Sequence, residues 1–442
     1  MRTVKQFLLT LALGLSLSVA AQTAGEVEFS RGVGFAQTQG QLPRTMGKGL
    51  VLKEGDRLTT SDGAAAIIKM QDGTRLTLRP NSELIMEQYR FKEGSTDNSM
   101  VMQLLRGGFR AITGFISKGA PNAAKVHTST STIGIRGTDF DVRICGPECR
   151  AESAKVNDKA RPNAVQASAK LVSTFGEVYA LDNAGVKRRL VDGASVFSGD
   201  TVETSPGAQV VLAFRDSSRL TLGGNTRFKV DTFVFDDKNP SEGHFFVTLL
   251  KGSLRALTGL IGKANNRNVG FTTATATIGI RGTGLDMDCG ATDSCSFFTW
   301  LGSIEVTPNG STALQTLQAG QGLFVGRTGI RPLTTPTLEN LPRPDTVPVQ
   351  IDQLFTNGSV SGDEEGLFVF VRDGHIEVTS LKETLHLGRG ETGFAGADGH
   401  TGRPVDMPLF IQFDKVPMPN NPNPMLLNVM SELGNRPSNQ CR

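Results

Sequence analysis

The sequence predicts an all-β protein in which one module occurs twice. We expect two tandem β-rich modules, with sandwich-like or solenoid-like sheets, followed by a smaller β-rich C-terminal segment. The first observation is an identical string, Thr-Ile-Gly-Ile-Arg-Gly-Thr, at Thr132–Thr138 and Thr277–Thr283. The second is that apolar residues mostly recur with a period of two, which is typical of half-buried strands. The third is the turn chemistry between such stretches, as at Asp72-Gly73 and Asn309-Gly310. Because the module is duplicated, its function should be a property of the module.

The first 21 residues have the pattern of a secretory signal peptide. Arg2 and Lys5 supply a positive start, an apolar run follows from Phe7 to Leu17, and Ser18-Val19-Ala20-Ala21 is a small-residue cleavage site. The run is shorter than the roughly 20 apolar residues that a membrane-spanning helix needs. An uncleaved membrane anchor is the alternative interpretation. We therefore expect a periplasmic or secreted protein from which residues 1–21 are removed.

The charge and aromatic content argue against nucleic acid as a partner. Without Arg2 and Lys5, 44 of the 46 basic residues remain against 43 acidic residues. A net charge near +1 gives no long-range attraction to nucleic acid or anionic lipid. Aromatic residues are only 6% of the chain, with one Trp and two Tyr, so few side chains could stack on bases. No segment after the signal is apolar enough to predict a membrane span.

The two copies agree along most of their length. The string RLTL occurs at Arg75–Leu78 and Arg219–Leu222, and LLRGGFRAITGFISK at Leu104–Lys118 becomes LLKGSLRALTGLIGK at Leu249–Lys263. A polar, Ala- and Lys-rich stretch separates the copies, and a Pro-rich stretch follows the second copy. The predicted organisation is a signal peptide (1–21), domain 1 (22–149), a linker (150–170), domain 2 (171–330), a Pro-rich linker (331–348), a C-terminal β segment (349–415) and a disordered tail (416–442).

Each module should contain a hairpin at the place of the Asp72-Gly73 turn. A loop with an odd number of residues keeps the apolar side chains of both strands on one face, and we expect it to set Met70 opposite Leu76. In copy two the turn is Asp216-Ser217-Ser218, which has no Gly to demand a primed turn.

The C-terminal segment resembles the end of copy two. Ile304-Glu305-Val306-Thr307 becomes Ile376-Glu377-Val378-Thr379, and Ala319-Gly320-Gln321 becomes Arg389-Gly390-Glu391. Copy one lacks an obvious equivalent of this end. We hypothesise that the C-terminal segment supplies it from a distance; a separate unit is the alternative.

Four of the five cysteines are expected to form two local disulfides, Cys145–Cys149 and Cys289–Cys295. Each pair follows its own copy of the repeated string. A zinc site is disfavoured because no His lies near either pair and the spacings are not typical of zinc ligands. A redox-active pair would favour two intervening residues at a helix start. Cys441 is left over near the C-terminus.

The repeated string is the candidate binding or structural motif. Its arginines could grip a carboxylate or phosphate through their planar guanidinium groups, or could cap carbonyl groups of a neighbouring strand. Its glycines suggest positive φ or close backbone approach, which favours the structural interpretation. The candidate residues are Thr132, Ile133, Gly134, Ile135, Arg136, Gly137 and Thr138 in copy one, and Thr277, Ile278, Gly279, Ile280, Arg281, Gly282 and Thr283 in copy two.

Arginine and lysine also flank a Gly turn in each copy. Arg106 and Arg110 correspond to Lys251 and Arg255. An acidic partner could use these cations, and a charged sheet edge that prevents unwanted strand pairing explains them equally well.

Nothing in the sequence predicts catalysis. The five histidines, at positions 127, 244, 375, 386 and 400, show no metal-ligand spacing, and neither a nucleophile motif nor a phosphate-binding loop occurs. We expect no catalytic residues, no cofactor and no metal, and the protein is not expected to be an enzyme.

The ordered set of motifs resembles the FecR-domain family. The set runs from a Gly-Asp turn through RLTL and Leu-Leu-Arg-Gly-Gly-Phe-Arg to the repeated string, over about Leu50–Val142 and again about Gly193–Val325. The resemblance implies an extracytoplasmic, all-β, non-catalytic domain. The family's best-known members relay the state of an outer-membrane iron-siderophore transporter to a sigma factor. Here a signal peptide replaces their sigma-binding domain and membrane helix, and the FecR domain is doubled, so that role is not carried over.

The expected function is therefore that of a protein- or ligand-binding module in envelope signal transduction. The implied partner is an envelope protein, either a membrane sensor or an outer-membrane protein. A structural scaffold associated with the cell wall or surface is the alternative.

Overall fold

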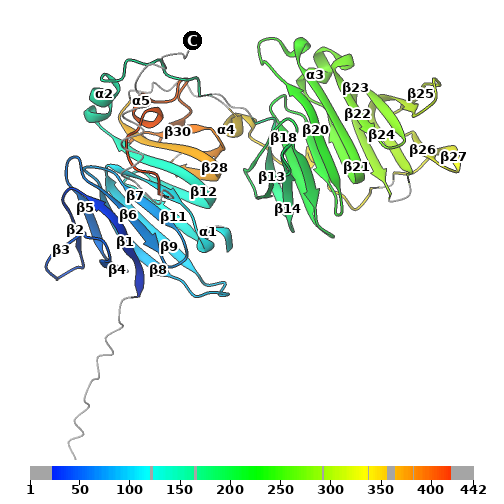
Figure 1. Cartoon of the computed structure of the whole chain (residues 1–442). Coiled ribbons are helices and arrows are strands. Elements are labelled where there is room, and N and C mark those ends of the chain that lie inside the picture. Colours follow the sequence, from blue (N-terminus) through cyan, green and yellow to red (C-terminus); the bar gives the residue numbers. More distant parts are fainter. Residues whose placement is uncertain are drawn as a thin grey trace, which may run out of the picture.

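The protein is all-β, as predicted, and its strands form two lobes (Figure 1). The computed structural model describes residues 22–119, 123–163, 167–290, 293–336, 338–355, 364–381 and 383–419. The predicted signal peptide (1–21), Cys441 and most of the predicted tail (416–442) lie outside these residues. We call residues 22–163 and 364–419 the first lobe, and residues 167–355 the second lobe.

The first lobe is one curled sheet of 16 strands. These are β1 (Thr23–Arg31), β2 (Gly34–Gln37), β3 (Arg44–Thr45), β4 (Val51–Lys53), β5 (Arg57–Thr60), β6 (Ala65–Met70), β7 (Arg75–Leu78), β8 (Glu83–Arg90), β9 (Ser99–Arg106), β10 (Gly108–Ile112), β11 (Ala124–His127), β12 (Ser131–Cys145), β28 (Gly366–Ser380), β29 (Thr384–Gly388), β30 (Thr392–Ala395) and β31 (Thr401–Gly402).

The second lobe is a sheet of 15 strands with the same plan. These are β13 (Ala169–Phe175), β14 (Val178–Leu181), β15 (Lys187–Leu190), β16 (Ser195–Val196), β17 (Thr201–Thr204), β18 (Gln209–Phe214), β19 (Arg219–Leu222), β20 (Arg227–Val234), β21 (His244–Leu257), β22 (Val269–Thr273), β23 (Ala276–Cys289), β24 (Cys295–Pro308), β25 (Gln315–Gln318), β26 (Gly322–Gly326) and β27 (Gly329–Leu333).

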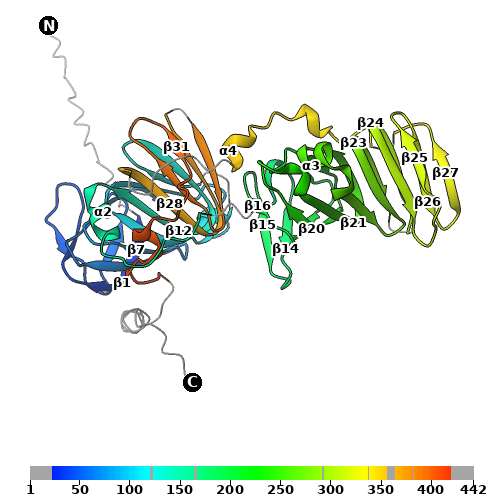
Figure 2. The same ribbon diagram turned by 90° about the horizontal axis from the view of Figure 1, so that it is seen from above.

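Short helices join the strands or cover the ends of the sheets. They are α1 (Phe115–Gly119), α2 (Pro147–Ser153), α3 (Leu260–Ala264), α4 (Ile351–Phe355) and α5 (Leu409–Gln412), with 3₁₀ turns η1 (Pro240–Glu242), η2 (Asn266–Asn268) and η3 (Pro344–Thr346). Helix α4 lies between the two lobes in both views (Figure 2).

The strand that carries the repeated string is central in each sheet. In the first lobe β12 pairs with β10 and β11 on one side and with β28 on the other. In the second lobe β23 pairs in the same way with β21, β22 and β24. Alternate residues of each strand enter a separate apolar core, with Ile133 and Ile135 in one and Ile278 and Ile280 in the other. Each lobe therefore has the core of an independent domain.

Strands β28 to β31 complete the first lobe. Along β28 the register runs from Ser131 opposite Ser380 to Cys145 opposite Gly366, with register shifts on either side of Asp139. The corresponding strand in the second lobe, β24, follows β23 after a loop of residues 290–294. The second lobe is thus inserted between β12 and β28 of the first lobe. The equivalent strands of the second lobe, β23 and β24, are joined only by the loop of residues 290–294. Insertion at an exposed strand connection leaves the pairing of both flanking strands intact.

The structure differs from the predicted borders around this insertion. Helix α2 extends into the stretch predicted as a linker (150–170), Pro162 within that stretch forms a β-bridge with Asp406, and β13 begins within it at Ala169. At the other end, Pro417 and Pro419 are buried within the stretch predicted as disordered. Composition could not reveal these contacts because they are made with residues far away in the chain.

The hairpin loop has an odd number of residues, but its register differs from the predicted one. Leu76 lies opposite Ile68, whereas Met70 faces Thr74 across the three-residue loop 71–73. The apolar side chains still share one face because the two registers differ by two residues. In the second lobe Ser217 adopts φ of +67°, near the +83° of Gly73, although the sequence contains no Gly there.

Buried Asp72 and Asp216 explain that backbone. The Asp216 carboxylate accepts bonds from the Ser218 backbone N–H (3.0 Å) and hydroxyl (2.8 Å), and Asp72 does the same with Thr74. These side-chain bonds hold the loop closed in both lobes, which stabilises the left-handed residue without Gly.

Candidate functional site

Most of the repeated string has a structural place in both lobes. Its isoleucines are buried in the core, and Gly134 and Gly279 are half-buried in the central strand. Gly137 and Gly282 have φ of +59° and +62° and form the β-bulge at which the register of β12 and β23 shifts. A left-handed bulge residue favours Gly, which accounts for the glycine at this position in both copies.

The last threonine of the string ties three strands together. In the second lobe the Thr283 N–H donates to the Thr258 hydroxyl at 3.0 Å, and the Thr283 hydroxyl donates to the Ser303 carbonyl at 2.8 Å. In the first lobe Thr138 makes the same bonds to Thr113 and to the His375 carbonyl, at 2.7 and 2.9 Å. This threonine therefore closes the bulge against both neighbouring strands. Thr132 and Thr277, at the other end of the string, are more exposed than Thr138 and Thr283.

The two arginines of the string have different surroundings. Arg281 is on the surface, where its side chain is 56% exposed and donates to Glu305 at 2.6 Å. It pairs with a carboxylate and not with the carbonyl groups of a neighbouring strand. Arg136 occupies the same position in the first lobe, but there it faces the second lobe.

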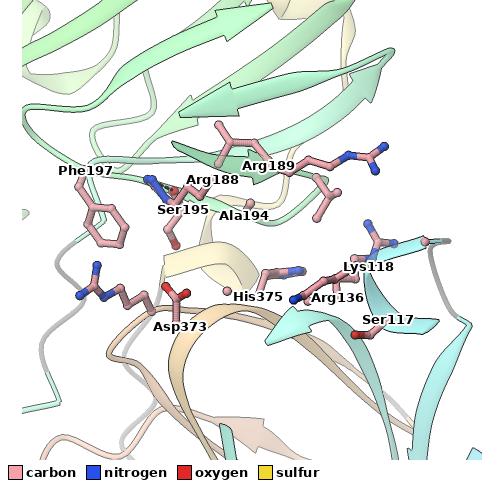
Figure 3. A pocket seen from close by; sticks show the side chains of 16 residues that line it. Ser117, Lys118, Arg136, Arg188, Arg189, Ala194, Ser195, Phe197, Asp373 and His375 are labelled. Atoms are coloured by element: carbon pink, nitrogen blue, oxygen red, sulfur yellow. Dashed lines mark hydrogen bonds between the residues drawn. The ribbon is translucent and has the colours of Figure 1, made fainter. Parts of the chain in front are cut away.

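Arg136 lines a pocket between the lobes with a volume of 310 Å³. Figure 3 shows Arg188, Arg189 and Phe197 of the second lobe on one side, facing Arg136, Asp373 and His375 of the first lobe. The pocket is therefore built by both copies of the module together. The other lining residues come from α1 and its end (Ser117, Lys118, Gly119), the bulges (Gly137, Gly374), the β15–β16 connection (Leu190, Val191, Ala194, Ser195) and Arg389 after β29.

The pocket has an excess of positive charge. Arg188 is paired with Asp200, but Lys118, Arg136, Arg189 and Arg389 have no ion-pair partner among the residues that the structure describes. Among the described residues that line it, Asp373 is the only acidic one. A carboxylate or another anion that enters the pocket would meet several cations at once, which strengthens its attraction.

His375 forms part of the pocket wall and is neutral. Burial, together with His386, Lys170 and Arg136, lowers the pKa of His375 well below its ordinary value. Its Nε2 lies 3.3 Å from Nδ1 of His386, whose pKa is also lowered by burial. A protonated imidazole would be repelled by the surrounding cations. The histidine pair therefore adds no positive charge to the pocket near neutral pH.

A buried ion pair holds the lobes together beside the pocket. Lys170 of the second lobe, fully buried, donates to Glu391 and to the His386 carbonyl of the first lobe, both at 2.8 Å. Arg403 lies 3.8 Å from the same carboxylate and also donates to the Leu354 carbonyl of α4 at 2.8 Å. Burial lowers the pKa of Lys170 to about 8, while the two cations lower that of Glu391.

Sequence reasoning located the string but not the pocket. The basic run Lys187-Arg188-Arg189 was an available signal, because it stands out in a strand of the second copy. Nothing local to the sequence, however, brings Arg189 next to Arg136. No group of His, Cys, Asp and Glu able to hold a metal occurs among the residues described. None of the helices in the described part of the chain is long and apolar enough to span a membrane.

Both predicted disulfides are present, but they connect different elements. Cys289–Cys295 joins residues directly opposite each other on β23 and β24. Cys145–Cys149 joins the end of β12 to α2, since the residue opposite Cys145 is Gly366 of the distant β28. Two disulfides indicate an oxidising, exported compartment.

These features define a class of protein: two copies of a disulfide-stapled all-β domain, with a cationic pocket between them. Residues 56–156 and 200–305 each match the family described as FecR protein. The chain therefore carries two tandem domains of the FecR family. The first match ends at residue 156, just after α2, because the remaining strands of that domain come after the second domain. FecR proteins are envelope-associated and in general regulatory rather than enzymatic.

Comparison with other proteins adds little to this assignment. No curated protein matches the chain. Two crystal structures of a "putative anti-sigma factor" from Parabacteroides distasonis ATCC 8503, at 1.65 and 2.50 Å resolution, are similar at 14% identity and a TM-score of 0.26. The similarity covers 32% of this chain and 62% of that one, which is less than two thirds of its length.

Proposed function

We propose that this protein is an exported, non-catalytic FecR-domain protein that binds a partner in envelope signal transduction, and that it binds through the pocket between its lobes. Family membership supports a regulator-like role, and the two disulfides support export. The partner is an envelope protein, either a membrane sensor or an outer-membrane protein.

The cationic lining of the pocket carries this proposal. Arg136 and Arg389 of one domain and Arg189 of the other surround a space that only the folded pair of domains creates. An acidic segment of a partner would neutralise these side chains, and arginine binds carboxylates with two parallel hydrogen bonds. Binding would therefore depend on both domains and on their relative placement.

The two arginines of the repeated string provide a matched test. Arg136→Glu reverses a charge in the pocket, whereas Arg281→Glu reverses the equivalent charge outside it. Each variant and the wild type would be used to capture proteins from an envelope extract. We expect the wild type and Arg281→Glu to retain the same stoichiometric membrane protein and Arg136→Glu to lose it.

Equal capture by both variants would refute the pocket as the binding site. Retention of the wild type by purified peptidoglycan, without a stoichiometric protein partner, would favour the alternative function of a cell-wall scaffold.

A further inference from the structure

A second feature is repeated in the two domains: a buried arginine paired with a buried aspartate. Arg110 pairs with Asp141, and Arg255 donates from Nε to Asp286 at 3.0 Å. These arginines are only 4% and 8% exposed, so they are not charges on a sheet edge. In each domain the pair leaves the outer guanidinium nitrogens free to bind another group.

In the second domain that group is a carbonyl in front of a proline. Arg255 Nη1 donates to the carbonyl oxygens of Leu338 and Leu341, at 2.9 and 2.6 Å. Leu341 begins the sequence Leu-Pro-Arg-Pro, in which Leu341 and Pro344 are buried. Arg343 has φ of −71° and ψ of 135°, the polyproline II conformation, and its guanidinium lies 4.1 Å from the ring centre of Trp300.

In the first domain the corresponding group is the C-terminal stretch Val-Pro-Met-Pro. Arg110 Nη1 donates to the Val416 carbonyl at 2.8 Å, and Pro417 and Pro419 are buried. Asp414, two residues ahead of Val416, accepts a bond from Arg110 Nη2 at 3.0 Å and pairs with Arg79. Both domains thus bind the same pattern, a hydrophobic residue followed by Pro-x-Pro, and use the same carbonyl.

Proline chemistry explains this recognition. Proline has no N–H and holds the residue before it in an extended conformation, so the carbonyl of that residue remains available for a donor from outside. An extended proline-containing segment also loses little conformational entropy when it binds. The two bound segments come from different parts of the chain and share this pattern, with an acidic residue, Glu339 or Asp414, two positions ahead of it. Recognition is therefore a property of the domain.

We propose that each FecR domain of this chain has a binding site for a hydrophobic-Pro-x-Pro segment. In this structure the segment of the chain that follows each domain occupies the site, and a segment of the same pattern from a partner protein can replace it. The site is separate from the pocket between the lobes, and this proposal does not depend on that pocket.

The two sites differ in what they accept around the shared pattern. Arg79 in the first domain corresponds to Gly223 in the second, so the first site favours an acidic residue two positions ahead, as in Asp414. In the second site Leu341 packs against Gly223 instead, with its Cδ1 3.7 Å from where a Cβ would lie. Trp300, whose ring contacts the arginine of Leu-Pro-Arg-Pro, is replaced by Arg372 in the first domain. The first site should therefore reject a cationic residue between the prolines.

A cavity of 820 Å³ adjoins the first site and gives room for a longer partner segment. Its lining includes Arg79, Arg143, Glu152 and Val416. The first site is also the more easily vacated one, since the segment that fills it lies after the last strand of the domain and does not connect the two lobes.

The test uses a fluorescein-labelled peptide with the sequence Phe-Asp-Lys-Val-Pro-Met-Pro and the full chain. Pro417→Gly combined with Pro419→Gly weakens the chain's own segment, and circular dichroism and melting temperature confirm that the variant is folded. Fluorescence anisotropy should show that this variant binds the peptide at least about 10-fold more tightly than the wild type, in which the tethered segment competes at millimolar effective concentration. A peptide with both prolines replaced by alanine, and the peptide Glu-Asn-Leu-Pro-Arg-Pro-Asp, should bind the variant at least about 10-fold more weakly.

Equal binding of the three peptides, or no binding of the first peptide to the folded variant, would overturn the proposal. Concentration-dependent dimerisation of the wild type that the double substitution abolishes would show instead that the segment is exchanged between two copies of this chain. Arg136→Glu should leave peptide binding unchanged, so this proposal and that for the inter-lobe pocket can fail separately.

Discussion

The buried pair of Lys170 and Glu391 allows the sharpest test of how the two lobes are held together. The Lys170 side chain is 0% exposed and the Glu391 side chain 2% exposed, and the pair joins strand β13 of one lobe to the first lobe beside β30. In Lys170→Ala the carboxylate loses its shortest ionic bond and keeps Arg403, which is 3.8 Å away, and the Gly388 N–H, which donates to it at 2.6 Å. Breaking one partner of a buried ion pair typically costs about 3–5 kcal/mol, because a buried charge is left uncompensated.

A control variant separates the cost of breaking this buried ion pair from the cost of breaking an exposed one. Lys187 pairs with Glu203 at 3.4 Å, but its side chain is 52% exposed, and such pairs contribute about 0–1 kcal/mol. We therefore expect Lys170→Ala to lower the free energy of unfolding by several kcal/mol and Lys187→Ala by less than about 1 kcal/mol, as measured by guanidinium denaturation. Glu391→Leu removes the carboxylate that lies beside both Lys170 and Arg403, so it should cost at least as much as Lys170→Ala.

Similar losses of stability for Lys170→Ala and Lys187→Ala would show that the buried ion pair does not hold the lobes together. So would a smaller loss for Glu391→Leu than for Lys170→Ala, since the shared carboxylate would then not be what compensates the buried cations.

Two further predictions concern the pH dependence and the repeated string. Because the pKa of His375 is lowered in the folded state, the unfolded chain takes up a proton below about pH 6.5 that the folded chain excludes, so stability falls as the pH falls. Urea denaturation at pH 7.5 and 5.5 should therefore show a smaller loss of stability for His375→Gln than for the wild type, by up to about 1.4 kcal/mol per pH unit. Equal losses would contradict this. Thr283→Val should cost about 1–3 kcal/mol, because buried backbone groups lose their partner, whereas Arg281→Ala should cost less than about 1 kcal/mol; the reverse order of melting temperatures would contradict the assignment.

The candidate site could be predicted only in part from the sequence. The repeated string was found because it is identical in both copies, yet its arginines have different roles in the two lobes. Arg136 lines the pocket only because the second lobe lies against it, and Arg281 has no such neighbour among the described residues. Likewise Arg110 and Arg255 look like surface cations in the sequence, but the segments of residues 414–419 and 338–344 cover them.

Features that depend on near neighbours in the chain could be predicted from the amino-acid sequence. Alternating hydrophobicity predicted the strands, turn residues predicted the hairpins, and the short spacing of the cysteines predicted both disulfides, because each of these arises within a few residues. The pairing of β28 with β12 across the inserted lobe, and the cationic pocket between the two domains, are seen only in the three-dimensional fold. The resemblance of the C-terminal segment to the end of copy two suggested the first of these. Which strand covers an open edge, and which charges become buried there, depends on contacts between residues more than 200 positions apart in the chain.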